Sequence, residues 1–207
     1  MERIGILDIG TGNLRSVFNA VHQNGFDPEL VVDPERIDAL SHLILPGVGN
    51  FRSAMLAIRA LNMEEALLAY AASGRPLLGV CLGMQLLART GFEGGATSGL
   101  GLIDGEVRFL RESTDLRIPH VGWNDVICRR SHPLFDGVKP DRDFYFVHSY
   151  AFVCADPGSV LAVSDYGGPV TCAVGCGNVV GVQFHPEKSQ SNGLRLLENF
   201  CLWDGAC

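Results

Sequence analysis

Cys81 lies between two glycines, at the point where a buried strand is predicted to run directly into a helix. Pro76 opens an apolar run of strand length, and residues 84–88 show helical spacing after the cysteine. This G-x-C-x-G arrangement is typical of a nucleophile elbow, in which small neighbours leave room for backbone and substrate to approach a reactive side chain. The start of the helix would also favour the thiolate, the nucleophilic form of cysteine. The alternative is a buried cysteine with a purely structural role.

His185 and Glu187 are the candidate partners of this cysteine. A cysteine hydrolase needs a base near the thiol and a third group that orients the base. The two residues follow a predicted strand at 179–184, and an extended backbone across Pro186 would point both side chains the same way. The histidine could take the thiol proton and return it to a leaving amine. His148 is the main rival base, although it has no carboxylate at close spacing.

Neither a metal nor a dinucleotide cofactor is expected. A Gly-x-Gly turn follows the first predicted strand, but Arg15 occupies the position of the third glycine of a dinucleotide-binding fingerprint. Cys172, Cys176 and Cys201 could cluster with a histidine, yet their spacing fits none of the common zinc patterns. We therefore expect these three cysteines to be small core residues.

Strands and helices alternate in the first part of the chain. Apolar runs predict strands at 4–7, 30–32, 42–45 and 76–80, with helices at 14–21, 51–58 and 64–71 between them and a closing helix at 194–200. The order predicts an α/β fold, an open and mostly parallel twisted sheet of flavodoxin-like type with helices on both faces. Glycines and short β-rich runs between 91 and 181 predict a smaller antiparallel region. Without a linker or repeat, residues 1–207 are expected to form a single domain.

Composition narrows the functional classes further. The formal net charge of -7 and a pI near 5.3 argue against a nucleic-acid binder, which needs a basic face. Seven cysteines without a C-x-x-C pair favour a reducing, cytoplasmic compartment. The first residues lack the apolar core of a signal peptide, and no apolar run has membrane-spanning length. We therefore expect neither a nucleic-acid nor a membrane partner.

The motifs at 79–85 and 185–187 together resemble the triad-type, or class I, glutamine amidotransferases. The chain looks most like one branch of that family, through motifs at 8–13, 46–49, 119–124, 145–150 and 183–189. The resemblance implies a cofactor-free glutaminase that hydrolyses glutamine to glutamate and ammonia. It also implies a heterodimer with a separate cyclase subunit of TIM-barrel fold, which would use the ammonia in histidine biosynthesis.

The same resemblance implies a role for individual residues. Cys81 would attack the glutamine side-chain amide, His185 would act as general base and acid, and Glu187 would orient His185. Backbone amides of Val48 and Leu82 would form the oxyanion hole, after a reorientation of the loop that holds Val48. The positions that would hold the substrate are Gly49, Gln85, Glu93, His148, Ser149 and Tyr150. The positions expected near the partner are Lys188, Asn13, Trp123 and Tyr145.

Two other functions remain open at this point. One is a stand-alone cysteine hydrolase of the same architecture, such as a peptidase or a gamma-glutamyl hydrolase, which would need no partner. The other is a non-catalytic interaction module in which Cys81 is structural. For the glutaminase, activity of the isolated chain is expected to be low, because an oxyanion loop that must reorient is not preorganised.

Overall fold

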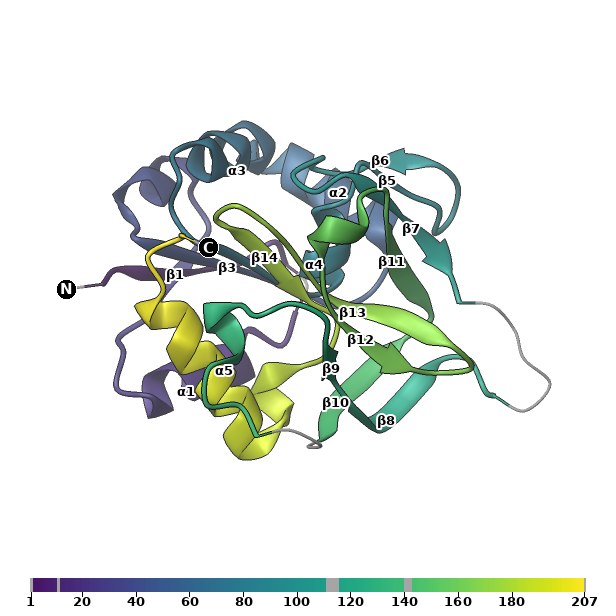
Figure 1. The fold of residues 1–207 in the computed structure, drawn as a ribbon. Helices are drawn as coiled ribbons and strands as arrows, with labels where there is room; N and C mark the ends of the chain where they lie inside the picture. Colours follow the sequence, from purple (N-terminus) through teal and green to yellow (C-terminus); the bar gives the residue numbers. More distant parts are fainter. Residues whose placement is uncertain (1, 11, 111–115, 140–142, 207) are drawn as a thin grey trace.

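The computed structural model describes residues 2–10, 12–110, 116–139 and 143–206, so Thr11 of the 8–13 motif lies outside the described residues. A central sheet crosses the molecule (Figure 1). Its parallel strands are β1 (Ile4–Leu7), β2 (Glu29–Val31), β3 (His42–Gly47), β4 (Leu77–Cys81) and β14 (Val179–Val182). Its antiparallel strands are β9 (Ile127–Cys128), β12 (Val160–Asp165) and β13 (Pro169–Cys176).

The strand order of this eight-stranded sheet is β2-β1-β3-β4-β14-β13-β12-β9. Strand β4 therefore lies in the middle, between β3 and β14, and is parallel to both. Every residue of β1, β3, β4 and β14 is buried, as expected for parallel strands that are covered on both faces. The central place of β4 puts Cys81, its last residue, between the ends of two neighbouring strands.

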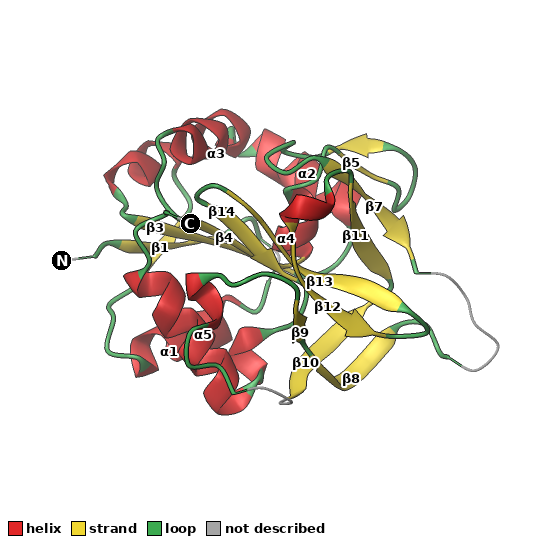
Figure 2. Ribbon diagram, viewed as in Figure 1, coloured by secondary structure: helices red, strands yellow, loops and turns green. Residues whose placement is uncertain are grey.

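Helices cover both faces of the sheet (Figure 2), which confirms the predicted architecture. On one face lie α1 (Leu14–Gln23) and α5 (Gln190–Leu202). On the other lie α2 (Phe51–Ala60), α3 (Met63–Ala72) and the short α4 (Leu82–Leu86). Short 3-10 turns are η1 (Pro34–Ala39), η2 (Pro133–Phe135), η3 (Pro157–Ser159) and η4 (Pro186–Lys188). Among the described residues, no helix combines the length and apolar character that crossing a membrane requires.

Two smaller sheets complete the β structure. One pairs β8 (His120–Asp125) with β10 (Asp143–His148) in antiparallel orientation. The other has the order β11-β7-β5-β6, formed by β5 (Thr90–Gly91), β6 (Thr97–Ser98), β7 (Gly105–Phe109) and β11 (Tyr150–Cys154). The predicted antiparallel region is thus divided: some of its strands form these sheets, whereas β9, β12 and β13 extend the main sheet.

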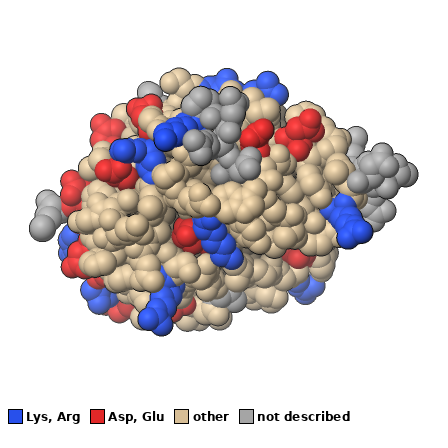
Figure 3. Space-filling model, turned by 90° about the horizontal axis from the view of Figure 1, so that it is seen from below, with Lys and Arg blue, Asp and Glu red and all other residues tan. Residues whose placement is uncertain are grey.

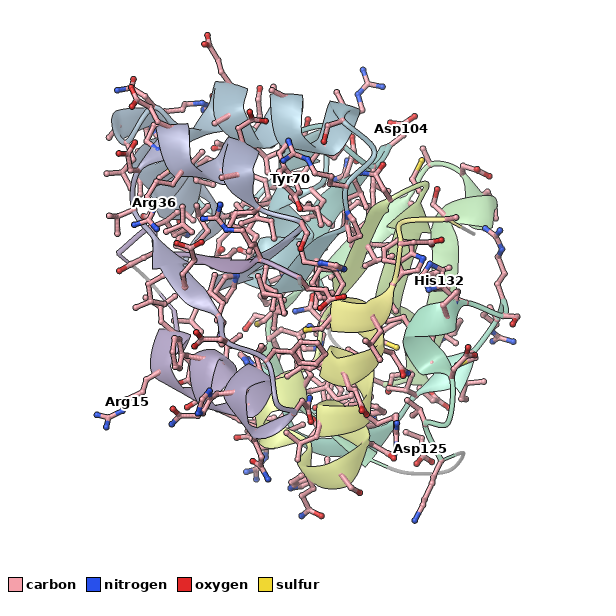
Figure 4. The ribbon with its side chains drawn as sticks, turned by 90° about the vertical axis from the view of Figure 1, so that its left-hand side faces the viewer. Arg15, Arg36, Tyr70, Asp104, Asp125 and His132 are labelled. Carbon is pink, nitrogen blue, oxygen red and sulfur yellow. The ribbon has the colours of Figure 1, made fainter. Side chains whose placement is uncertain are left out.

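The start of β4 is held by Tyr70 of α3, labelled in Figure 4. The Tyr70 hydroxyl donates a hydrogen bond to the Pro76 carbonyl at 3.1 Å. The Arg75 guanidinium stacks on the Tyr70 ring at 4.4 Å and donates to the Leu40 carbonyl at 2.9 Å. These contacts anchor the strand that ends in Cys81.

Candidate active site

Cys81 has a backbone conformation that few residues other than glycine adopt. It ends β4 and precedes the first turn of α4, with φ 55° and ψ −111°. Such a conformation costs free energy and persists only where the surrounding structure enforces it, as at a nucleophile elbow. The side chain is 6% exposed but lines a cavity. The predicted turn from strand to helix is therefore present, although α4 is short.

The two glycines of the elbow allow α4 to pack directly on the sheet. A Cβ at Gly83 would lie 1.7 Å from the Leu45 carbonyl oxygen of β3, and a Cβ at Gly79 would lie 2.6 Å from the Gly83 carbonyl oxygen. The predicted room for backbone is therefore confirmed, but neither glycine lines the cavity, so the expectation that they also leave room for substrate is wrong. The space that they leave is filled by protein backbone.

His185 and Glu187 meet in a buried ion pair. The distance from His185 Nδ1 to Glu187 Oε1 is 2.8 Å, and the two side chains are only 2% and 1% exposed. We expected an extended backbone across Pro186, and this expectation is wrong. The backbone forms the 3-10 turn η4, which brings the two side chains together. Asn13 donates a hydrogen bond to the same Glu187 oxygen at 3.4 Å.

The charge state of His185 depends on its two neighbours. Burial would by itself lower the pKa of His185, but Cys81 and Glu187 outweigh burial and raise that pKa to about 10. Glu187 occupies Nδ1, so Cys81 acts on the other side of the ring, where the buried Nε2 has no hydrogen-bond partner among the described residues. This arrangement favours a proton on the imidazole of His185.

His148 cannot take the place of His185 as the base. Its Nδ1 donates to the Tyr150 carbonyl at 2.9 Å, and its Nε2 lies 3.0 Å from His120 Nδ1. Burial is the main cause that lowers the pKa of His148 to about 4; the neighbouring His120 and His185 act in the same direction, against the opposing effect of the Tyr150 carbonyl. Both ring nitrogens are engaged, so this neutral ring lines the cavity without being free to act as a base.

A cavity of about 300 Å³ opens above the Cys81 side chain. Its walls include all six positions that the resemblance assigns to substrate, together with Cys81 and His185. The full set is Val48, Gly49, Cys81, Leu82, Gln85, Glu93, Pro119, Val147, His148, Ser149, Tyr150 and His185. One carboxylate oxygen of Glu93 accepts a hydrogen bond from the Phe51 amide at 2.7 Å, which holds this acid at the cavity wall.

Val48 lies next to the elbow because of strand register. Gly47 at the end of β3 pairs with Cys81 at the end of β4. Val48 and Leu82 therefore lie side by side, each directly after one of these two adjacent strands. A Cβ at Gly47 would lie 3.1 Å from the Leu82 Cβ, which shows how closely the two turns pack. Gly49 has φ 105°, a backbone conformation that only glycine adopts easily. A Cβ added at this position would have no atom within 4 Å.

An apolar strip on β8 and β10, formed by Val121, Trp123, Tyr145 and Val147, contains two of the four residues expected near a partner. Trp123 and Tyr145 are paired in register, with ring centroids 5.9 Å apart. The Lys188 ammonium lies 5.4 Å from the Tyr145 ring centroid. Val121 and Val147 are paired in register on the same strands and are exposed. Asn13, in contrast, contacts the buried Glu187.

Gln183, His120 and Asn124 were not assigned a role from the sequence, yet the structure places all three in the polar network around Cys81. Gln183 Nε2 lies 3.8 Å from Cys81 Sγ. His120 contacts His148, and Asn124 Nδ2 lies 3.2 Å from His120 Nε2. Gln183 precedes His185 by two residues, so strand periodicity could have indicated that both point to the same side.

No metal-binding cluster accompanies this cavity in the described part of the chain. Those residues contain no group of three or more His, Cys, Asp or Glu side chains that could hold a metal ion. Arg15, in the position of the missing fingerprint glycine, is exposed and points outward from α1 (Figure 4).

Comparison with known proteins agrees with this geometry. The family model for class-I glutamine amidotransferases matches residues 5–203. The chain is 45% identical to imidazole glycerol phosphate synthase subunit HisH 2 of Nitrobacter winogradskyi, over 99% of this chain and all of that protein. It is 46% identical to subunit HisH of Symbiobacterium thermophilum, over 97% of this chain and 93% of that protein.

Solved structures show the same fold at lower identity. A crystal structure of a glutamine amidotransferase matches with a TM-score of 0.74 at 22% identity, covering 97% of this chain and 99% of that one. The structure of PurLQS from Thermotoga maritima matches with a TM-score of 0.74 at 22% identity, covering 98% of each chain. The chain therefore belongs to the class-I glutamine amidotransferase family.

Proposed function

We propose that this chain is the glutaminase subunit of an imidazole glycerol phosphate synthase and that Cys81, His185 and Glu187 form its catalytic triad. The observation that carries the proposal is the buried His185–Glu187 pair, at 2.8 Å, beside a cysteine on a strained elbow. Cys81 Sγ attacks the side-chain carbonyl carbon of glutamine, and the carbonyl oxygen becomes an oxyanion. His185 gives its proton to the leaving nitrogen, which departs as ammonia. Water then hydrolyses the thioester to glutamate and restores the thiol.

The cavity walls supply the remaining functions in this proposal. The Leu82 and Val48 amides, next to each other at the elbow, stabilise the oxyanion, and loss of one such donor typically costs about 3 kcal/mol of barrier. Glu93 would face the ammonium group of glutamine. The other assigned positions are Gly49, Gln85, His148, Ser149 and Tyr150, and they would hold the rest of the substrate. Residues 1–207 would act as one domain.

The proposed partner is a cyclase subunit that receives the ammonia. Relatives 45–46% identical over nearly the whole chain are named as subunits of imidazole glycerol phosphate synthase. The apolar strip on β8 and β10, with Val121 56% and Trp123 46% exposed, offers a surface for such a partner beside the cavity. Lys188, over the Tyr145 ring, would lie at the mouth of the ammonia path.

The distribution of surface charge is compatible with a protein partner and does not favour a nucleic-acid partner. On the face seen in Figure 3, acidic and basic side chains are interspersed and broad areas carry neither. A nucleic-acid partner would need a continuous basic face, which the net charge of -7 does not favour. A cytoplasmic enzyme that works as a heterodimer is the proposal that fits these features.

Glutamate release tests this function. It is measured for the chain alone, with its cyclase, and with the cyclase plus the ribonucleotide substrate of the cyclase. We expect low release from the chain alone and the highest release from the loaded complex, because partner binding would favour the active form of the Val48 turn. Cys81→Ala should lower release in the loaded complex by about 10⁴-fold or more.

The alternatives give different results in the same experiment. Equal release with and without the cyclase would indicate a stand-alone hydrolase. Unchanged release from Cys81→Ala would remove Cys81 as the nucleophile. No release from any mixture, with an unreactive Cys81, would indicate a non-catalytic module.

A further inference from the structure

We propose that Gln183 is a positioning residue that donates a hydrogen bond from its side-chain amide to the sulfur of Cys81. The inference rests on the proposed function, because it concerns the reactive form of the same cysteine. It adds a residue that lies behind the nucleophile and outside the triad.

The location of Gln183 limits what it can contact. The residue follows β14 and is 0% exposed. Its backbone amide donates to the Cys172 carbonyl of the neighbouring strand at 2.9 Å, which holds the segment in place. It is not among the residues that line the cavity, so it can affect the substrate only through other side chains. One of these is Cys81, whose Sγ lies 3.8 Å from Gln183 Nε2.

The orientation of the Gln183 amide follows from a chain of donors and acceptors. The Tyr150 carbonyl can only accept, and Gln85 Nε2 lies 2.9 Å from it. Gln85 must therefore present its NH₂ group, which also donates to Gln183 Oε1 at 2.9 Å. Because Gln183 uses its oxygen toward Gln85, it presents its own NH₂ group to Cys81. The sulfur is the acceptor at the end of this chain.

His148 and His120 determine the second hydrogen bond that the Tyr150 carbonyl accepts. His148 Nδ1 donates to the Tyr150 carbonyl at 2.9 Å, so His148 Nε2 must accept from His120 Nδ1 at 3.0 Å. His120 Nε2 in turn accepts from Asn124 Nδ2 at 3.2 Å. All hydrogen bonds in this network run in directions that agree with one another, and the Tyr150 carbonyl accepts two of them, from Gln85 and from His148. Reversing the Gln85 amide would place two oxygens against each other at Tyr150.

The consequence for catalysis is a donor that remains when His185 changes charge. A thiolate accepts hydrogen bonds more strongly than a thiol, so the Gln183 donor favours the thiolate. His185 gives its proton away during the reaction, whereas the Gln183 amide keeps its proton. Gln183 would therefore support the thiolate both before attack and when the thioester is cleaved.

Gln183→Met tests the proposal, because methionine has nearly the same length and cannot donate a hydrogen bond. The isolated chain is alkylated with iodoacetamide over a range of pH, and the peptide that contains Cys81 is quantified by mass spectrometry, which separates it from the other cysteines. We expect the midpoint of the pH profile to move upward by about 0.5–1 pH unit. In the loaded complex, kcat should fall by about three- to tenfold, and KM for glutamine should change less than kcat because Gln183 does not line the cavity.

Phe184→Leu is the matched control, because Phe184 is buried in the same segment. Its ring packs against that of Phe144, with the two ring centroids 4.2 Å apart. This variant should lower the melting temperature without moving the Cys81 midpoint. An unchanged midpoint in Gln183→Met, or an equal shift in Phe184→Leu, would overturn the inference. Failure of the unmodified chain to alkylate at Cys81 and to release glutamate would instead contradict the proposed function.

Discussion

His185 keeps its proton in a buried site because two side chains act on opposite sides of its ring. Glu187 binds Nδ1 at 2.8 Å and leaves Nε2 for the cysteine. A neutral amide at position 187 would remove the charge and could present a donor instead of an acceptor. Either change would favour the wrong tautomer of the imidazole, as happens when the acid of a catalytic triad is replaced.

We therefore predict that Glu187→Gln lowers kcat for glutamate release by about 10²- to 10⁴-fold in the loaded complex. KM should change little, because Glu187 does not line the cavity. Glu198→Gln is the matched control, since Glu198 forms an exposed ion pair with Arg195 on α5. Equal activity of Glu187→Gln and Glu198→Gln would contradict the assigned role of Glu187.

Strand β4 and helix α4 act as one unit that presents the cysteine. The strained backbone of Cys81 is held from two sides. Tyr70 anchors the start of β4 through Pro76, and α4 packs at Gly83 directly against the backbone of β3. Strain of this kind can persist only where its neighbours cannot relax. The close packing of α4 on β3 is the contact that prevents relaxation.

Gly83→Ala should therefore destabilise the fold by at least about 3 kcal/mol, because the added methyl group would lie 1.7 Å from the Leu45 carbonyl oxygen. Gly25→Ala is the comparison: Gly25 has φ 87° with nothing within 4 Å of the added atom. That variant should lose only about 1–2 kcal/mol, the cost of the left-handed backbone. Urea denaturation measures both, and similar losses would show that α4 can shift at little cost.

At the scale of the whole molecule, a buried polar network connects the β8–β10 sheet with the elbow on the main sheet. His120 on β8 stacks between Phe146 and Tyr166, with ring centroids at 4.7 and 3.9 Å. Burial lowers the pKa of His120 to about 4, as it does for His148. Both rings must be neutral to make their hydrogen bonds in the direction that the network requires.

Stability should therefore fall in acid. The folded pKa of His120, about 4, lies below the ordinary value of 6.5, so its contribution is present above pH 6.5 and is lost as the pH falls toward 4. Between pH 7.5 and pH 5 we expect a loss of about 2 kcal/mol for each of the two histidines. The free energy of unfolding, measured in urea at both pH values, reports this loss.

His120→Gln should reduce the acid loss by about 2 kcal/mol, because glutamine can donate and accept at similar positions without titrating. His22→Gln is the control, since His22 is exposed on α1. If the acid loss in His120→Gln equals that of the unmodified chain, burial of His120 is not the cause.

The local chemistry and the fold class could be predicted from short stretches of the chain. Apolar runs and helical spacing predicted the parallel strands and the helices on both faces, because periodic burial is encoded residue by residue. The G-x-C-x-G elbow and the His-x-Glu pair were visible for the same reason, since their members lie within a few residues of one another. The relation between these motifs came from family resemblance.

The way in which the side chains act together depends on contacts between distant segments and became visible only in the folded chain. Gln183 contacts Cys81 across 102 positions and Gln85 across 98, and Gln85 reaches Tyr150 across 65. No local pattern encodes which end of an amide faces which partner, because the direction depends on acceptors brought in by distant strands. The turn at η4 and the division of strands between three sheets were likewise decided by contacts between segments far apart in the chain.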